Sequence, residues 1–163
     1  MLYLYYKNKF KSLKIIKAHM KNLYTNKKAF HNYFILQKFE AGIVLTGSEV
    51  KSCKHSRIDL TDSYVSIDRN ELILHNSFIA HYKNSGYVYH IEKQDRKLLM
   101  HKKEILKFKQ DLFIKGLTLI PLAFYLKNGL IKVEIALAKG KHNYDKREDL
   151  KEKETKKEIK KFV

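Results

Sequence analysis

The sequence predicts a mainly β protein: a small closed antiparallel barrel with two to three flanking helices and a basic C-terminal tail. Three observations predict this class. Most apolar segments are short and alternate with polar residues, two tight turns join pairs of such segments, and helical periodicity is limited to modest stretches. With 163 residues and 44% hydrophobic content, the chain can bury one core. We therefore expect one domain with tails.

The first long strand is expected over residues 33–45, which are rich in aromatic and branched apolar residues. Gly42 lies inside this segment and predicts a bend or bulge where the strand turns a corner. A short helix is expected next, over about 49–56. Ser48 is the expected N-cap, and Glu49 falls in the first turn, where the helix dipole favours a carboxylate.

A hairpin should follow. Residues 63–67 alternate, residues 68–70 provide the turn, and residues 71–75 return. Residues 81–95 are polar and aromatic without periodicity, so we expect an exposed loop there.

A second helix is expected over residues 100–113. Ile105, Phe108 and Leu112 fall on one face of this helix, whereas its lysines fall toward solvent. Gly116 is the expected C-cap, because glycine adopts the left-handed conformation that commonly ends a helix.

Two strands over about 117–127 and 130–138 should form a second hairpin, since Asn128-Gly129 is the strongest short hairpin signal. Pro121 has no N–H to donate, so its strand is expected to be an edge or to be bulged there. In the second strand, alternation places Lys132 on the face away from the core, toward solvent or a ligand. An OB-like barrel fits this size and number of elements.

The formal net charge of +17 is concentrated at the two ends of the chain. Residues 1–30 carry eight Lys and no acidic residue, and residues 139–163 carry ten basic and six acidic residues. A charge of this size attracts polyanions, so nucleic acid is the first candidate partner and an anionic membrane the second. Compositional bias of an AT-rich genome is an alternative explanation of the charge.

The chain therefore divides into three parts. Residues 1–26 form a basic N-terminal extension, and Met20 is a plausible alternative start. An amphipathic helix or a presequence remains an alternative for the first 19 residues. Residues 27–139 form the OB-like RNA-binding barrel. Residues 140–163 form a basic tail without an apolar stripe, which we expect to be disordered alone.

Basic residues interleaved with aromatic rings suit RNA, because rings stack on unpaired bases while cations neutralise phosphates. Tyr144 is the clearest candidate, since a lone aromatic residue in an unpackable tail has no core to serve. Tyr33 either stacks on a base or packs as a strand residue. Glu40 and Glu49 are residue types more often found as solvated or paired surface acids than as acceptors for RNA.

The sequence gives no indication of catalysis. The eight histidines show no metal-ligand spacing, and no phosphate-binding loop or nucleophile elbow occurs. Cys53 is the only cysteine, which excludes an internal disulfide and a multi-cysteine metal site. We expect no enzyme activity, no metal, no cofactor, no signal peptide and no transmembrane helix, and therefore a cytoplasmic protein.

Several segments of the chain resemble small protein B, the tmRNA-binding (SsrA-binding) protein family of bacterial trans-translation. They occur in family order over residues 27–153. The matching segments are His31-Asn32-Tyr33-Phe34-Ile35, the run from Phe39 to Ser52, Asp62-Ser63-Tyr64-Val65, the run from Arg96 to His101, Lys127-Asn128-Gly129, Ala138-Lys139-Gly140-Lys141 and Asp145-Lys146-Arg147.

This resemblance implies a monomeric, non-enzymatic adaptor that has no membrane partner. It would bind the tRNA-like domain of tmRNA and deliver it, with alanyl-tmRNA and elongation factor Tu, to stalled 70S ribosomes. Its tail would become helical in the empty mRNA channel, near the decoding centre in 16S rRNA. A ribosomal or ribosome-assembly protein that binds RNA without tmRNA specificity is the alternative, and an RNA-processing enzyme is a more distant one.

The resemblance also implies two sets of contact residues. The residues expected to bind tmRNA are Tyr33, Glu40, Leu99 and Lys132. Those expected to contact the decoding centre and the mRNA channel are Lys139, Gly140, Lys141, Tyr144, Asp145, Lys146 and Arg147. The tail departs from the family, because it is shorter than expected and carries Glu154 and Glu158 among its lysines.

Overall fold

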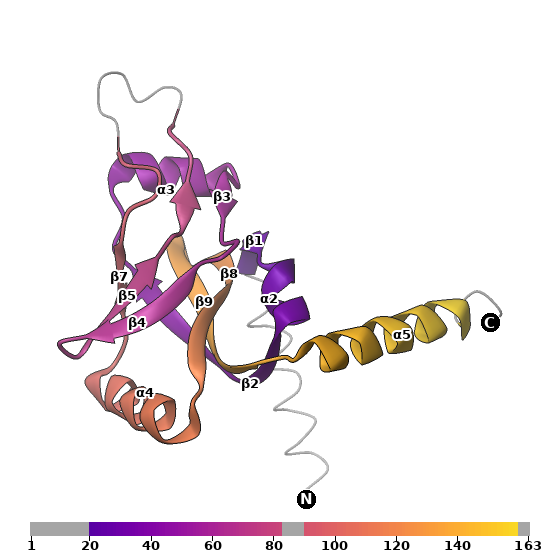
Figure 1. Cartoon of the computed structure of the whole chain (residues 1–163). Helices are drawn as coiled ribbons and strands as arrows, with labels where there is room; N and C mark the ends of the chain where they lie inside the picture. Colours follow the sequence, from indigo (N-terminus) through magenta and orange to yellow (C-terminus); the bar gives the residue numbers. More distant parts are fainter. Residues whose placement is uncertain (1–19, 83–89, 160–163) are drawn as a thin grey trace, which may run out of the picture.

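The computed structural model describes residues 20–82 and 90–159, and Figure 1 shows their arrangement. The strands are β1 (Met20–Thr25), β2 (Tyr33–Ile43), β3 (Ile58–Asp59), β4 (Tyr64–Asp68), β5 (Glu71–His75), β6 (Phe78–Ile79), β7 (Arg96–Leu99), β8 (Thr118–Lys127) and β9 (Leu130–Gly140). The helices are α2 (Lys27–Asn32), α3 (Gly47–Lys54), α4 (Lys102–Lys115) and α5 (Asn143–Ile159). The protein is mainly β, as the sequence predicts.

Within the described residues, most strands belong to one antiparallel sheet in the order β1-β8-β4-β5-β7-β2-β9. β8 also pairs with β9, so the ladders lead from β8 through β4, β5, β7, β2 and β9 back to β8. β3 and β6 form a separate two-stranded sheet. None of the helices in the described ranges is long and apolar enough to cross a membrane.

The main core forms where the sheet is covered by α3 and α4. The predicted apolar face of α4 is confirmed, since Ile105 and Phe108 are buried and Leu112 packs against the same cluster. Phe108 meets Phe39 of β2 edge to face, with ring centroids 4.5 Å apart. Gly116 ends α4 in the left-handed conformation (φ 58°), as predicted.

A second, smaller apolar cluster lies between α2 and the sheet. Ala29 of α2 packs there with buried residues of β8 and β9, namely Ile120, Leu122, Ala136 and Ala138. Ala136 and Ala138 are therefore buried on the face of β9 opposite the main core. The sequence pattern assigned only one face of β9 to a core, so it missed this packing.

Both predicted hairpins are present. Arg69 and Asn70 connect β4 to β5, and Asn128 and Gly129 connect β8 to β9. All four residues have positive φ, which matches the twist that a two-residue antiparallel turn requires. The predicted bulge near Pro121 is confirmed, because the β8–β9 register shifts between Pro121 and Ala123.

Of the bend or bulge predicted at Gly42, the bulge is wrong, because the β2–β9 register shows no shift there. The irregularity in β2 lies between Ile35 and Gln37. Gly42 instead pairs on one side with Leu99 of β7 and on the other with Lys132 of β9. A Cβ added at Gly42 would lie 3.2 Å from the Leu99 Cβ, so the absence of a side chain permits this close approach.

The predicted N-cap of α3 is also wrong. Thr46, not Ser48, caps the helix, and Glu49 completes a capping box by accepting a hydrogen bond from the Thr46 N–H at 2.7 Å. Glu49 is buried and forms an ion pair with Arg96, whose Nε lies 2.8 Å from Glu49 Oε1. Glu49 is therefore a structural acid of the core and not a surface acid.

The sheet begins before residue 27, the predicted start of the barrel. β1 pairs with β8, and Asn26 follows directly as the N-cap of α2. The buried Asn26 carboxamide donates to the carbonyl oxygens of Leu60 and Pro121, at 2.9 and 3.3 Å. The expectations for the first 19 residues lie outside the described part of the chain.

The structure differs in part from the exposed loop predicted over residues 81–95. Residues 83–89 lie outside the described ranges. His90 is buried, and its ring bonds the Ser48 hydroxyl and the Ile79 carbonyl. This part of the predicted exposed loop therefore packs against α3 and β6.

Candidate nucleic-acid interface

Glu40 is the centre of a polar cluster on the outer face of β2. Its carboxylate accepts hydrogen bonds from Lys127 Nζ, at 2.7 and 3.0 Å, and from the Tyr125 hydroxyl, at 2.7 Å. Partial burial acts to raise the pKa of Glu40, but these bonds and the charges of Lys127 and Lys132 outweigh it, so the pKa lies below its usual value. Glu40 is thus a fixed anion whose remaining lone pairs can accept from a ligand.

Leu99 and Lys132 lie beside this carboxylate. Both border a surface depression of about 480 Å³ that Glu40 and Gly42 also line. Leu99 is 51% exposed at the end of β7, and Lys132 is half-buried in β9, opposite Gly42. The structure therefore brings together three of the four residues expected to bind tmRNA.

The rim of this depression includes residues that are not among the sequence-predicted contacts. Met100 and His101 line it from the segment that leads into α4, and Glu104 lines it from the first turn of that helix. They could not be selected from sequence, because only the β2–β7 pairing places the end of β7 next to β2. Tyr125 could have been selected from sequence, because counting back from the Asn128-Gly129 turn pairs it with Lys132.

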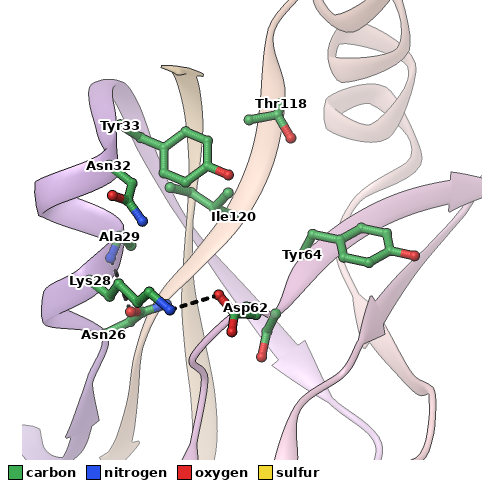
Figure 2. A pocket seen from close by; sticks show the side chains of 10 residues that line it. Asn26, Lys28, Ala29, Asn32, Tyr33, Asp62, Tyr64, Thr118 and Ile120 are labelled. Atoms are coloured by element: carbon green, nitrogen blue, oxygen red, sulfur yellow. Dashed lines mark hydrogen bonds and ion pairs between the residues drawn. The ribbon is translucent and has the colours of Figure 1, made fainter. Parts of the chain in front are cut away.

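Tyr33, the fourth expected residue, lies at the other end of β2. It borders a separate cavity of about 380 Å³ with α2, β8 and the chain before β4 (Figure 2). Part of its ring packs against the small cluster beneath α2. The sequence left open whether Tyr33 stacks on a base or packs as a strand residue. Its position is compatible with both roles, because Tyr33 packs on one side and faces a cavity on another.

The root of the tail is tied to the body next to Tyr33. Lys139 and Gly140 pair with Phe34 and Tyr33 at the end of β9. The Lys141 N–H donates to the Asn32 carbonyl at 2.9 Å, and Lys141 Nζ lies 5.0 Å from the centroid of the Phe34 ring. Lys139, Gly140 and Lys141 are therefore anchored, which fixes the point where the chain leaves the body.

Beyond this anchor, residues Asn143–Ile159 form α5, which projects away from the sheet in Figure 1. From the sequence, this segment is expected to be disordered alone, whereas the structure gives a helix. Asp145 explains where it begins, since its carboxylate accepts from the His142 N–H at 2.9 Å and lies in the first turn. The predicted dependence of the helix on the ribosome stays a prediction.

The candidate tail residues Tyr144, Lys146 and Arg147 all lie in the first two turns of α5. Tyr144 is 69% exposed. A hydrogen bond to Glu148 raises the pKa of Tyr144 above its usual value. The ring is therefore available for stacking, with cationic side chains close by along the helix.

In the part of the chain that the structure describes, no group of three or more His, Cys, Asp or Glu could hold a metal ion. Cys53 is buried in the core, where desolvation raises the pKa of its thiol to about 12. A thiol with that pKa is protonated near neutral pH and is a poor nucleophile.

A mainly β body, exposed Leu99 and Tyr144 side chains and a net charge of +17 define a small basic protein whose charge attracts polyanions. The family model described as SmpB protein matches residues 23–163. The chain therefore belongs to the SmpB family.

Curated relatives are similar over nearly their whole length. The SsrA-binding protein of Sulfurihydrogenibium sp. is 58% identical over 137 residues, which cover 84% of this chain and 90% of the relative. That of Bacillus subtilis is 50% identical over 139 residues, which cover 85% and 89%. A solved structure described as "tmRNA-SmpB: a journey to the center of the bacterial ribosome" contains a chain that is 39% identical, with a TM-score of 0.63 and coverage of 78% of this chain and 93% of that one.

Proposed function

We propose that this protein is the tmRNA-binding adaptor of trans-translation. The body binds the tRNA-like domain of tmRNA and brings it to stalled ribosomes, and the tail enters the empty mRNA channel at the decoding centre. One structural observation carries the proposal: Glu40, Leu99 and Lys132, distant in sequence, border a single depression. Membership in a family of SsrA-binding proteins supports it.

Each residue at this depression has a distinct role in the proposal. Lys132 neutralises a phosphate, and Leu99 packs on the sugar or base surface. Glu40 accepts hydrogen bonds from base or ribose donors, because Lys127 and Tyr125 hold its carboxylate ionised and fixed.

For the tail, we propose that Lys139, Gly140 and Lys141 set its direction. Tyr144 then stacks on an exposed rRNA base, while Lys146 and Arg147 neutralise phosphates. Asp145 fixes the start of α5 through its bond to the His142 N–H. A tail helix without an apolar stripe then needs no partner in its own body.

We also propose that the circuit of paired strands is a closed OB-like barrel. The ladder from β8 back to β8 supports this assignment, since closure removes free sheet edges. The protein acts as a monomer without cofactor or catalysis, together with alanyl-tmRNA and elongation factor Tu in the cytoplasm.

A filter-binding assay with the full chain tests the function. We expect tight binding to the cognate tmRNA and much weaker binding to bulk tRNA, and equal affinities would contradict the proposal. A ribosomal or assembly protein without tmRNA specificity is the alternative that the basic chain ends favour. Co-purification separates the two, because an adaptor should be enriched on stalled ribosomes over translating ones.

A further inference from the structure

A serine, a histidine and an aspartate meet on the outer face of the sheet, across β4, β5 and the start of β7. Ser66 Oγ lies 2.8 Å from His75 Nε2, and His75 Nδ1 lies 2.8 Å from Asp95 Oδ1. We call these three residues the Ser66 triad. None of them lines the depression at Glu40 or the cavity beside Tyr33, so the triad is separate from the residues expected to bind tmRNA.

Strand register brings the Ser66 triad together. The β4–β5 ladder places Ser66 diagonally across from His75 on the same face. On the other side of β5, Leu74 pairs with Arg96, so the next position along the two strands sets Asp95 beside His75. The sequence analysis found no nucleophile motif, because the three residues come from three separate segments and only their pairing makes them neighbours.

The hydrogen bonds of the triad fix the tautomer of the neutral imidazole. A carboxylate only accepts, so His75 Nδ1 carries the proton and donates it to Asp95. His75 Nε2 then has a free lone pair and accepts from the Ser66 O–H. The Tyr64 ring stacks on the imidazole, with ring centroids 4.9 Å apart, and restrains its orientation.

A hydroxyl that donates to an imidazole, itself held by a carboxylate, is the arrangement that activates a serine nucleophile. Ser66 is half-buried and therefore reachable from solvent, and the His75 and Asp95 side chains are 21% and 64% exposed. Ser66 and His75 supply a nucleophile and a base, but neither stabilises the oxyanion that forms on an attacked carbonyl. The donor must therefore carry a good leaving group, as a thioester or a phenyl ester does and an amide does not.

We propose that Ser66 is an acylation site that takes an acyl group from an activated ester or thioester. Ser66 Oγ attacks the carbonyl carbon of the donor, and its proton moves to His75 Nε2. The C–S or C–O bond of the donor then breaks, and the proton leaves with the thiol or phenol. Asp95 stabilises the imidazolium that forms in between.

The product is an oxygen ester on Ser66. Its leaving group is the serine alkoxide, which is poor, so attack by water without oxyanion stabilisation is slow and the ester persists. Each chain therefore accepts one acyl group and does not turn over. The proposal goes beyond the adaptor function and does not depend on it.

Ser48 provides a matched comparison in the same protein. Its Oγ lies 3.1 Å from His90 Nδ1, while His90 Nε2 lies 3.0 Å from the Ile79 carbonyl oxygen. A neutral carbonyl thus takes the position that the Asp95 carboxylate has in the Ser66 triad, and it stabilises an imidazolium less. We expect Ser48 to be acylated at least about tenfold more slowly than Ser66.

The test is incubation of the full chain with 4-nitrophenyl acetate, followed by peptide mapping with mass spectrometry. We expect an acetyl group on Ser66 that alkaline hydroxylamine removes, as it removes esters and leaves lysine amides intact. No acetyl group on Ser66 would overturn the proposal. Equal rates of acetylation at Ser66 and Ser48 would also overturn it, since the carboxylate would then have no effect.

Variants assign the roles within the triad. His75→Gln should slow acetylation of Ser66 by about 10²-fold or more, the contribution of a general base. Asp95→Asn keeps a hydrogen-bond acceptor but loses the charge, so it should slow the reaction by at least about tenfold, and Asp95→Glu should restore part of the rate. Ser48→Ala is the control and should leave the Ser66 rate unchanged.

Circular dichroism checks that each variant is folded, and the partly exposed positions of the triad make this outcome expected. An unchanged Ser66 rate in folded His75→Gln protein would refute activation by the histidine. Equal rates in the Asp95→Asn and parent proteins would refute the positioning role of Asp95.

Discussion

Arg96 and Glu49 form a buried ion pair in which Arg96 Nε lies 2.8 Å from Glu49 Oε1 and each side chain is 1% exposed. Arg96 also donates to the Ser77 carbonyl and hydroxyl, at 2.6 and 2.8 Å. The pair joins α3 to the start of β7, and removal of one partner leaves the other charge buried without compensation. The stability of the body therefore depends on both residues.

We predict that Arg96→Met lowers the free energy of unfolding by about 3–5 kcal/mol, because the Glu49 carboxylate then stays buried and unpaired. Urea denaturation followed by circular dichroism measures this change. Glu71→Gln is the control, since Glu71 pairs with Lys97 at a half-exposed site and should contribute about 1 kcal/mol or less. Similar losses in both variants would contradict the role of burial.

The same pair predicts a dependence of stability on pH. Burial acts to raise the pKa of Glu49, but the Thr46 N–H, Arg96 and Gln94 outweigh burial and hold that pKa below its usual value. The resulting stabilisation is complete above the unfolded-state pKa of about 4.3 and is lost as pH falls through the lower folded-state pKa. In the Glu49→Gln variant, the free energy of unfolding should therefore fall less steeply as pH is lowered. An unchanged slope of unfolding free energy against pH would contradict this contribution of Glu49.

Lys132→Ala should weaken tmRNA binding and reduce the slope of log affinity against log salt by about 0.7–0.9, the value for one phosphate contact. Filter binding at several salt concentrations gives this slope. Lys109→Ala, on the exposed side of α4, is the control and should leave the slope unchanged. If Lys132→Ala behaves like the control, Lys132 does not contact RNA.

Gly42→Val should displace Leu99, because a Cβ at Gly42 already approaches the Leu99 Cβ to 3.2 Å. We expect a larger loss of tmRNA affinity than from Gly47→Ala, where the added Cβ meets nothing within 4 Å. Thermal unfolding of both variants shows whether the body stays folded. Unchanged affinity in folded Gly42→Val protein would remove Leu99 from the proposed interface.

Deletion of the residues after Lys141 should leave tmRNA affinity nearly intact and abolish peptide tagging on stalled ribosomes. Lys141 is retained because its N–H bonds the Asn32 carbonyl and holds the end of β9 to the body. Filter binding and an in vitro tagging assay measure the two properties. Loss of both together would mean that body and tail are not separate modules.

Local patterns predicted much of the fold. The Asn128-Gly129 turn, the Gly116 C-cap and the apolar face of α4 each depend on neighbouring residues, and all three are confirmed. The N-cap of α3 was missed because Thr46 and Ser48 are both good capping residues, although Glu49 stands three residues after Thr46, at the spacing of a capping box.

Long-range pairing was harder to predict. β1 was placed in an extension because its polar and aromatic residues resemble a basic tail, and only its ladder with β8 makes it part of the sheet. The candidate residues lie in two separate places, with Tyr33 at the cavity beneath α2 and Leu99 at the depression beside Glu40. This division also depends on strand register. The tail contacts stay predictions.

The spacing of exposed apolar side chains along α5 limits the shape of whatever surrounds it. Tyr144 and Leu150 are 69% and 46% exposed, and a helix turns by about 100° per residue. Six positions then place the two side chains about 120° apart around the axis. This separation is at least as wide as the stripe that a helix usually presents to one packing surface, so a partner that buries both side chains is expected to be a concave groove.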